Sequence, residues 1–191
     1  MFTIATWNIN SVRLRAGLVA RLLQEEAPDV LCLQECKSPV DKIPLTRFAD
    51  LGYTHLVARG QTGYNGAALL SRLPLEDVTR GLPGDDSDEQ ARYLEALIEA
   101  PVPVRVASIY LPNGNPVPGP KFDYKLQWMD RLAARAAELR ASEAPVVLAG
   151  DWNVCPTDLD LARPDMMAGD ALVQPESRGR FRNLAACGWT D

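Results

Sequence analysis

The feature that most constrains the fold is a set of short apolar runs that end in polar side chains. Residues 146–149, Val-Val-Leu-Ala, are followed by Gly150, Asp151, Trp152 and Asn153. Runs of this length bounded by turn residues are typical of buried strands. A strand that leaves the core at Gly150 would place Asp151 and Asn153 at a sheet edge, where they could hold a metal ion, take a proton or steady an anion. The simpler alternative is a loop whose Asp and Asn side chains make turn hydrogen bonds.

Strand-like and helix-like segments alternate at both ends of the chain, and strands crowd its middle. A strand at 2–6, a helix with Ser11 as N-cap and a strand at 30–33 occupy the first 35 residues. The helix is predicted from an apolar stripe of Leu14, Leu18, Val19, Leu22 and Leu23. The following segments are predicted as a short helix near 45–51, strands at 54–58, 67–71, 76–80, 93–99 and 104–109, a long helix from Phe122 to about Ser142, a helix start at 156–158, a loop at 163–178 and a last helix at 179–187.

This order of segments predicts an α/β fold in one domain that covers residues 1–191. Periodicity alone leaves two architectures open, a doubly wound sheet and two sheets sandwiched between helices. The cluster of short, hairpin-spaced strands in the middle favours the sandwich, because such spacing is typical of antiparallel pairing.

Composition excludes several classes of protein. Hydrophobic residues make up 47% of the 191 residues, which is typical of a globular chain with a real core. No apolar run approaches the roughly 20 residues that span a bilayer, so no membrane association is expected. The N-terminus shows no secretory signal and the four cysteines form no C-x-x-C pair, which together favour a cytoplasmic protein with free, buried thiols. The net charge of −5 argues against coating nucleic acid by charge alone.

Four predicted strands end in side chains of related chemistry: Asn8, Glu35, Tyr110, and the pair Asp151 and Asn153. Hard carboxylate and amide oxygens suit Mg²⁺, which keeps several waters. A second carboxylate could act as general base, while an amide and a phenol could hydrogen-bond a charged phosphoryl oxygen. This set of groups is what metal-assisted phosphodiester hydrolysis needs. Taken singly, each also has a simpler reading: a surface or capping Glu35, turn asparagines, and a core Tyr110.

The motifs around these residues resemble the exonuclease III family, a branch of the endonuclease/exonuclease/phosphatase superfamily. The resemblance rests on five blocks in the same order along nearly the whole chain: Thr6-Trp7-Asn8-Ile9-Asn10, Leu33-Gln34-Glu35-Cys36-Lys37, Gly63-Tyr64-Asn65-Gly66-Ala67-Ala68, Tyr110-Leu111-Pro112-Asn113-Gly114, and Gly150-Asp151-Trp152-Asn153 with Pro156-Thr157-Asp158-Leu159-Asp160. The resemblance implies a four-layered α/β sandwich, with two mixed sheets flanked by helices. It also implies a DNA repair nuclease that cuts 5′ to abasic sites and removes nucleotides from 3′ ends of duplex DNA.

The resemblance assigns roles to individual residues. It makes Glu35 the main Mg²⁺ ligand with Asn8 beside it, with Mn²⁺ as an alternative ion, and leaves open whether one metal or two act. Asp151 would orient or deprotonate the attacking water and, with Asn153, contribute to the metal and phosphate site. Tyr110 would contact the phosphate, and Asn113 would contact the substrate backbone. The expected partner is double-stranded DNA with abasic sites or 3′ ends, bound by a monomer.

One part of the family pattern has no counterpart in the 191 residues. Family members continue with an Arg-Ile-Asp motif and a terminal Ser-Asp-His motif, neither of which occurs in this sequence. We therefore expect a C-terminally incomplete domain that is poorly stable and largely inactive by itself. Two other hypotheses stay open at this point: another phosphodiesterase or phosphatase of the superfamily, and a non-catalytic fragment that binds nucleic acid or a partner.

Overall fold

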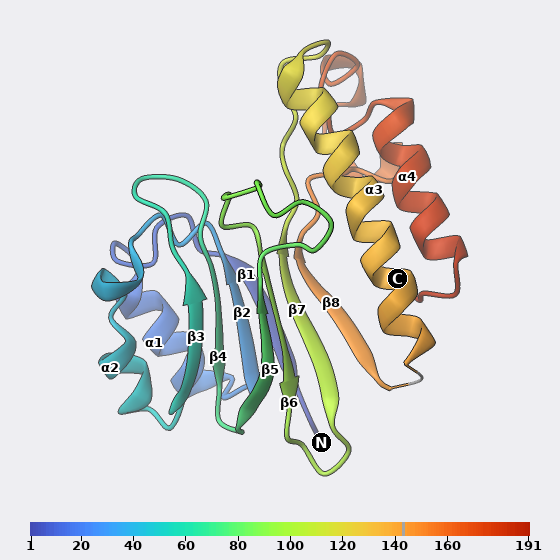
Figure 1. The fold of residues 1–191 in the computed structure, drawn as a ribbon. Helices are drawn as coiled ribbons and strands as arrows, with labels where there is room; N and C mark the ends of the chain where they lie inside the picture. The colour runs from blue at the N-terminus through green and yellow to red at the C-terminus, as the bar shows by residue number, and fades with distance from the viewer. Residues whose placement is uncertain (143) are drawn as a thin grey trace. The chain divides into compact units, whose positions relative to one another are not determined.

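The structure, a computed structural model, describes residues 1–142 and 144–191 (Figure 1). Its contacts divide the chain into two compact units. The first comprises Met1–Tyr110 together with strand β8 (Val146–Asp151), and the second comprises Leu111–Ser142 and Trp152–Asp191. Strands dominate the first unit and helices the second. None of the helices in the described residues is long and apolar enough to cross a bilayer.

The first unit contains two mixed sheets of four strands each. One sheet has the order β1-β2-β4-β3, built from Ile4–Asn8, Val30–Gln34, Ala67–Ser71 and His55–Arg59. The other has the order β5-β6-β7-β8, built from Leu75–Arg80, Tyr93–Ile98, Val104–Tyr110 and Val146–Asp151. In each sheet one edge pair is parallel, β1 with β2 and β7 with β8, and the remaining pairs are antiparallel. The predicted α/β class with two mixed sheets is confirmed.

Apolar side chains fill two layers of this unit. Between the sheets, the β2 and β4 residues Val30, Cys32 and Leu69 pack with the β6 and β7 residues Leu94 and Val106. On the other face of the first sheet, alternate residues of the same strands pack against α1 (Ala16–Glu25) and α2 (Leu45–Ala49), which lie together on that face (Figure 1). Because strand residues alternate between faces, one continuous apolar run can supply both layers.

A hydrogen bond between side chains joins the two sheets at the C-terminal end of β2. The Gln34 side chain is 1% exposed, and its Nε2 donates to Ser108 Oγ on β7 at 3.0 Å. Nε2 also donates to Thr6 Oγ1 on β1 at 3.1 Å. A buried amide costs free energy unless it is hydrogen-bonded, so these contacts specify how β1, β2 and β7 meet.

The start of the first helix differs from the sequence prediction. Helix α1 begins at Ala16, and its N-cap residue is Arg15 rather than Ser11. The amide N–H of Ser11 instead donates to the Glu35 carbonyl at 2.8 Å. This contact continues the β1–β2 pairing past the strand ends, so the helix begins later in the chain than predicted. Leu14 and Leu18, predicted to face the core, are 83% and 50% exposed.

The second unit is built around two helices, α3 (Pro120–Ala141) and α4 (Pro175–Ala186). The long helix has nearly its predicted bounds, but α4 begins four residues before the predicted 179, because Pro175 suits a first helical turn. The rings of Trp152 and Phe181 pack edge to face, with their centroids 5.5 Å apart, and Arg180 on α4 pairs with Asp130 on α3 at 2.7 Å. The rest of this unit holds two short 3₁₀ turns, Asp158–Asp160 and Pro164–Met166; a third, Val40–Lys42, lies in the first unit.

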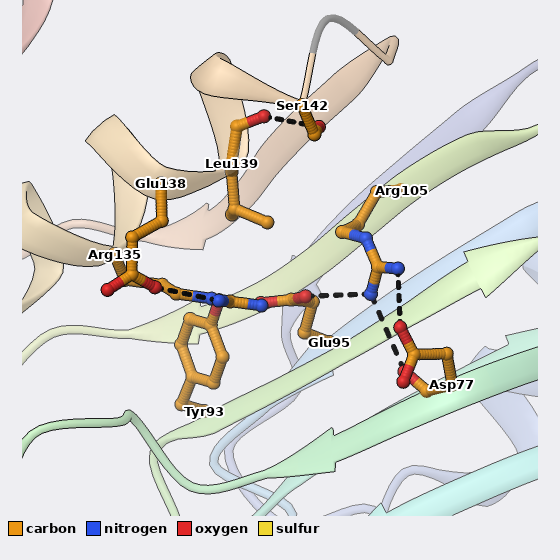
Figure 2. Close-up of polar contacts among 8 residues, drawn as sticks. All are labelled: Asp77, Tyr93, Glu95, Arg105, Arg135, Glu138, Leu139 and Ser142. Atoms are coloured by element: carbon orange, nitrogen blue, oxygen red, sulfur yellow. Dashed lines mark hydrogen bonds and ion pairs between the residues drawn. The ribbon is translucent and has the colours of Figure 1, made fainter.

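A charged cluster is buried in the second sheet (Figure 2). Glu95 on β6 is fully buried and accepts hydrogen bonds from Tyr93 Oη at 2.5 Å and from the Arg105 guanidinium at 2.8 Å. Arg105 also pairs with Asp77 at 2.6 Å. Asp77 lies where the register of β5 shifts against β6, and it has a φ of 45°. A buried carboxylate persists only where such partners compensate for its lost hydration.

Candidate active site

The site residues of the first unit lie where its parallel strands end. Asn8 is the last residue of β1, and Glu35 follows the last residue of β2. Tyr110 and Asp151 are the last residues of β7 and β8, and they stand opposite one another in the parallel pair. The carboxyl ends of parallel neighbours share an edge, so two edge pairs from two sheets bring four side chains to one place.

Hydrogen bonds join these four side chains directly. The Asn8 amide nitrogen donates to Glu35 Oε1 at 3.0 Å and to Asp151 Oδ2 at 2.8 Å. The Tyr110 hydroxyl donates to the same Glu35 oxygen at 2.8 Å. Residues separated by up to 143 positions in the chain therefore form one polar cluster. The structure therefore brings together four strand ends whose spacing in the sequence did not establish that they converge.

The second oxygen of Glu35 faces a cation supplied by the chain. Lys37 Nζ lies 2.6 Å from Glu35 Oε2 and donates to Asn10 Oδ1 at 2.6 Å. Partial burial acts to raise the pKa of Glu35, but hydrogen bonds from Lys37, Asn8 and Tyr110, with the charge of Lys37, outweigh it and hold that pKa below its usual range. Glu35 is therefore a carboxylate, and its Oε2 already faces a positive group.

The backbone around Glu35 has an uncommon conformation. Glu35 and Lys37 have φ values of 53° and 50°, and Asn10 has a φ of 45°. Left-handed backbone at non-glycine residues costs free energy and persists only where the surroundings impose it. Here the amides of Cys36 and Lys37 donate to carbonyls of the 65–66 loop at 3.0 and 2.8 Å. These contacts aim the Glu35 and Lys37 side chains toward the cluster.

Gly150 determines how closely β8 approaches β7. Its φ is 153°, and a Cβ added there would lie 1.9 Å from the carbonyl oxygen of Ile109. No side chain fits at that distance, so only glycine allows the strand to reach its end beside Tyr110. The Gly-Asp dipeptide is thus a geometric unit, in which the glycine places the aspartate that follows it.

Arg92 is a neighbour of the cluster that the sequence did not identify. Its guanidinium carbon lies 4.7 Å from the centre of the Tyr110 ring, and its Nε donates to Gln90 Oε1 at 2.7 Å. The Tyr110 amide donates to the Arg92 carbonyl at 2.8 Å. Burial, and then the contact with Glu35, raise the pKa of Tyr110 to about 12, so the hydroxyl remains a hydrogen-bond donor at neutral pH. No motif in the sequence singled out Arg92, whereas Lys37 belonged to a recognised block.

The two remaining predicted residues lie in the second unit and contact each other. Asn113 Nδ2 donates to Asn153 Oδ1 at 3.3 Å, and Asn153 Nδ2 donates to the Leu111 carbonyl at 2.9 Å. Asn153 has a left-handed φ of 44°. The structure therefore pairs Asn113 with Asn153, as it groups the four residues of the first unit.

The chemistry of the donor set fits a hard divalent cation. The carboxylate oxygens of Glu35 and Asp151 converge on the Asn8 amide group. The Lys37 ammonium lies between Glu35 and Asn10, which shows that these oxygens accommodate a positive charge. Across the described residues, no three His, Cys, Asp or Glu side chains gather into a cluster of their own. One or two carboxylates with retained waters are what Mg²⁺ usually takes, whereas Zn²⁺ sites need nitrogen or sulfur ligands.

Comparison with known proteins identifies the family of the chain. The pattern of the Endonuclease/Exonuclease/phosphatase family matches residues 5–191. The chain is 29% identical to exodeoxyribonuclease III of Haemophilus influenzae over 194 residues, which cover 97% of this chain and 72% of that protein.

Two solved structures are similar in fold. An AP endonuclease from Archaeoglobus fulgidus is 34% identical with a TM-score of 0.91, and the match covers 98% of this chain and 71% of that one. A 3′-5′ exonuclease from Neisseria meningitidis is 36% identical with a TM-score of 0.92, over 98% of this chain and 72% of that one. The family resemblance, and with it the enzyme class of an exonuclease III-type phosphodiesterase, are confirmed: the chain belongs to the Endonuclease/Exonuclease/phosphatase family.

Proposed function

We propose that this chain carries the catalytic cluster of a Mg²⁺-dependent DNA repair nuclease that acts on abasic sites and 3′ ends of duplex DNA. One observation carries the proposal: the Asn8 amide joins the carboxylates of Glu35 and Asp151, while the Tyr110 hydroxyl donates to Glu35. The cluster combines two carboxylates in different surroundings with neutral donors. Such a set suits in-line attack of water on a phosphodiester.

Each residue has a distinct part in this proposal. Glu35, with Asn8 beside it and Asp151 and Asn153 completing the set, would hold Mg²⁺ or Mn²⁺, which when bound neutralises charge on the phosphate. Asp151 would orient the water and accept its proton, since its carboxylate lies beside Glu35 and shares the Asn8 amide with it. Tyr110 would donate to a phosphate oxygen, Asn153 would position the phosphate, and Asn113 would contact the substrate backbone.

The proposed substrate rests on the relatives. The similar proteins are named as exodeoxyribonuclease III, an AP endonuclease and a DNA repair nuclease. A net charge of −5 is compatible with a site that recruits a divalent cation before it meets a phosphate. We further propose a cytoplasmic monomer that binds duplex DNA and no membrane.

A second candidate is removal of a terminal phosphate. A Neisseria protein described as a 3′ phosphatase, solved with a product DNA hairpin, is 36% identical with a TM-score of 0.91. The same cluster serves either reaction, since both break a bond from phosphorus to oxygen. The two activities differ in the leaving group, so a comparison of DNA substrates with different 3′ ends separates them.

The test uses the purified protein and three duplexes: one with an internal abasic site, one with a recessed 3′ hydroxyl and one with a 3′ phosphate. A phosphorylated lipid serves as the non-nucleic-acid substrate. We expect incision of the abasic duplex with Mg²⁺, none with excess EDTA, and no reaction with the lipid. Release of phosphate alone from the third duplex would favour the second candidate.

Two variants connect the activity to the cluster. Asp151→Asn keeps the shape but removes the base, so kcat is expected to fall roughly 10²–10⁴-fold. Glu35→Gln is expected to raise the Mg²⁺ concentration needed for half-maximal activity. Asp50→Asn, at an exposed position, is the matched control and is expected to behave like the wild type. Full activity of Asp151→Asn would overturn the assignment.

A further inference from the structure

Lys125 on α3 is a fully buried lysine in the second unit. Its Nζ donates to three backbone carbonyls: Asn153 at 2.5 Å, Asn113 at 3.0 Å and Ala171 at 3.4 Å. These carbonyls come from three segments that are far apart in the sequence. An ammonium is strongly hydrated in water, so its burial is tolerated only where fixed acceptors replace that hydration.

Two of the three carbonyls belong to the asparagines of the proposed site. Their side chains also meet, because Asn113 Nδ2 donates to Asn153 Oδ1 at 3.3 Å. The backbone of both residues therefore faces one cation while their amides face each other. Asn153 has a left-handed φ of 44°, which such contacts can hold in place.

The chain beside Asn113 is shaped around the lysine. Gly114 has a φ of 94°, and a Cβ added to it would lie 2.6 Å from Lys125 Cδ. Glycine therefore gives the aliphatic part of the lysine room to pass. The third acceptor is held as well, since the Ala171 carbonyl also accepts from Ser177 Oγ at 2.7 Å and the Ala171 amide donates to Asn115 Oδ1 at 2.9 Å.

We propose that Lys125 is a positioning residue for the nuclease reaction: its ammonium acts as a fixed internal cation that holds the segments of Asn113 and Asn153 together. The lysine itself is buried and is not proposed to contact substrate. The proposal rests on the proposed function of Asn153. It predicts that loss of the ammonium disorders these two segments locally and slows the chemical step.

The first arm of the test is hydrogen exchange, which needs no activity. Lys125→Met keeps the length of the side chain and removes its donors. We expect amide exchange at least about tenfold faster in peptides that cover 111–115 and 152–157, with unchanged exchange in β1 and β2. Lys121→Met changes an exposed lysine of the same helix and is the matched control. Lys125→Arg retains a cation and is expected to recover most of the protection. Unchanged exchange in Lys125→Met, or no recovery in Lys125→Arg, would overturn the proposal.

The second arm is a double-mutant cycle on incision kinetics. Small displacements of positioned groups cost up to about 100-fold in rate, so Lys125→Met is expected to lower kcat by 10- to 100-fold with little change in KM. In an Asn153→Ala background the same change is expected to cost less than twofold, because Lys125 acts through Asn153. Multiplicative losses would show that the lysine acts elsewhere and would refute the positioning role. If the wild type has no nuclease activity, the proposed function fails, and the exchange arm still decides the role of Lys125.

Discussion

At the scale of single residues, the cluster is held together because a few side chains make several contacts each. The Asn8 amide donates hydrogen bonds to both carboxylates. Glu35 accepts hydrogen bonds from Asn8 and Tyr110 and forms an ion pair with Lys37. Glu35 and Asp151 are both half-buried. In the proposed mechanism they take different roles, as two carboxylates of one site can: Glu35 holds the cation and Asp151 handles a proton.

Arg92 gives a test at this scale. Its guanidinium covers the Tyr110 ring, and contacts of this type contribute about 0.5–2 kcal/mol, which corresponds to roughly 2- to 30-fold in a rate or binding constant. We expect Arg92→Met to lower kcat/KM on an abasic duplex by this factor, and Arg92→Lys to lower it by less. Arg80→Met, at an exposed arginine of β5 in the sheet that contains Tyr110, is the control. A wild-type kcat/KM for Arg92→Met would mean that Tyr110 needs no such support.

At the scale of elements, the site depends on how strands end. Parallel pairing places Tyr110 beside Asp151, and Gly150 permits the close approach of β7 and β8. The sheet that carries this pair also contains the buried Glu95 with its partners Arg105 and Tyr93. The stability of β5, β6 and β7 is therefore tied to charge pairing as well as to apolar packing.

Arg105→Met tests that dependence. The substitution removes a charged hydrogen bond to a fully buried carboxylate, and such bonds contribute about 1.5–3 kcal/mol. The comparison is Arg21→Met, because Arg21 and Glu25 form an exposed i,i+4 pair worth about 0.3–0.5 kcal/mol. Urea unfolding should show the larger loss in Arg105→Met. Equal losses in the two variants would contradict the structural role of the buried pair.

At the scale of the whole molecule, binding of a divalent cation is expected to raise the free energy of unfolding. A ligand that binds only the folded chain at 100 times its Kd stabilises it by about 2.7 kcal/mol. For a chain of this size each kcal/mol moves Tm by roughly 2–4 °C. We expect Mg²⁺ to raise the Tm of the wild type, and the rise to be much smaller in Glu35→Gln, whose neutral amide binds the ion poorly.

Asp50→Asn controls for general effects of charge, and the Mg²⁺-dependent shift should persist in it. The shift should also persist in Arg92→Met, since Arg92 contacts Tyr110 and is not a proposed ligand. An identical shift in wild type and Glu35→Gln would place the cation elsewhere on the molecule. This measurement needs no substrate, so it separates the metal site from the nuclease reaction.

Several features of the fold could be predicted because they depend on local pattern. The apolar runs at 30–33 and 67–71 became β2 and β4, since strands buried on both faces have continuous apolar sequence. The N-cap at Ser11 was wrong because a tertiary contact, the amide of Ser11 to the carbonyl of Glu35, overrode a local preference. The start of α4 was predicted late because residues 175–178, Pro-Glu-Ser-Arg, carry no apolar stripe.

The sequence by itself determined approximately where the strands end, the types of side chain near those ends and, through motif resemblance, the family. It could not show that Asn8, Glu35, Tyr110 and Asp151 meet, because their convergence depends on two parallel edge pairs in two different sheets. Tertiary structure alone supplied Arg92 over Tyr110 and the buried Lys125 among three carbonyls. Both are ordinary cationic residues in the sequence, and their significance arises from long-range contacts that no local pattern encodes.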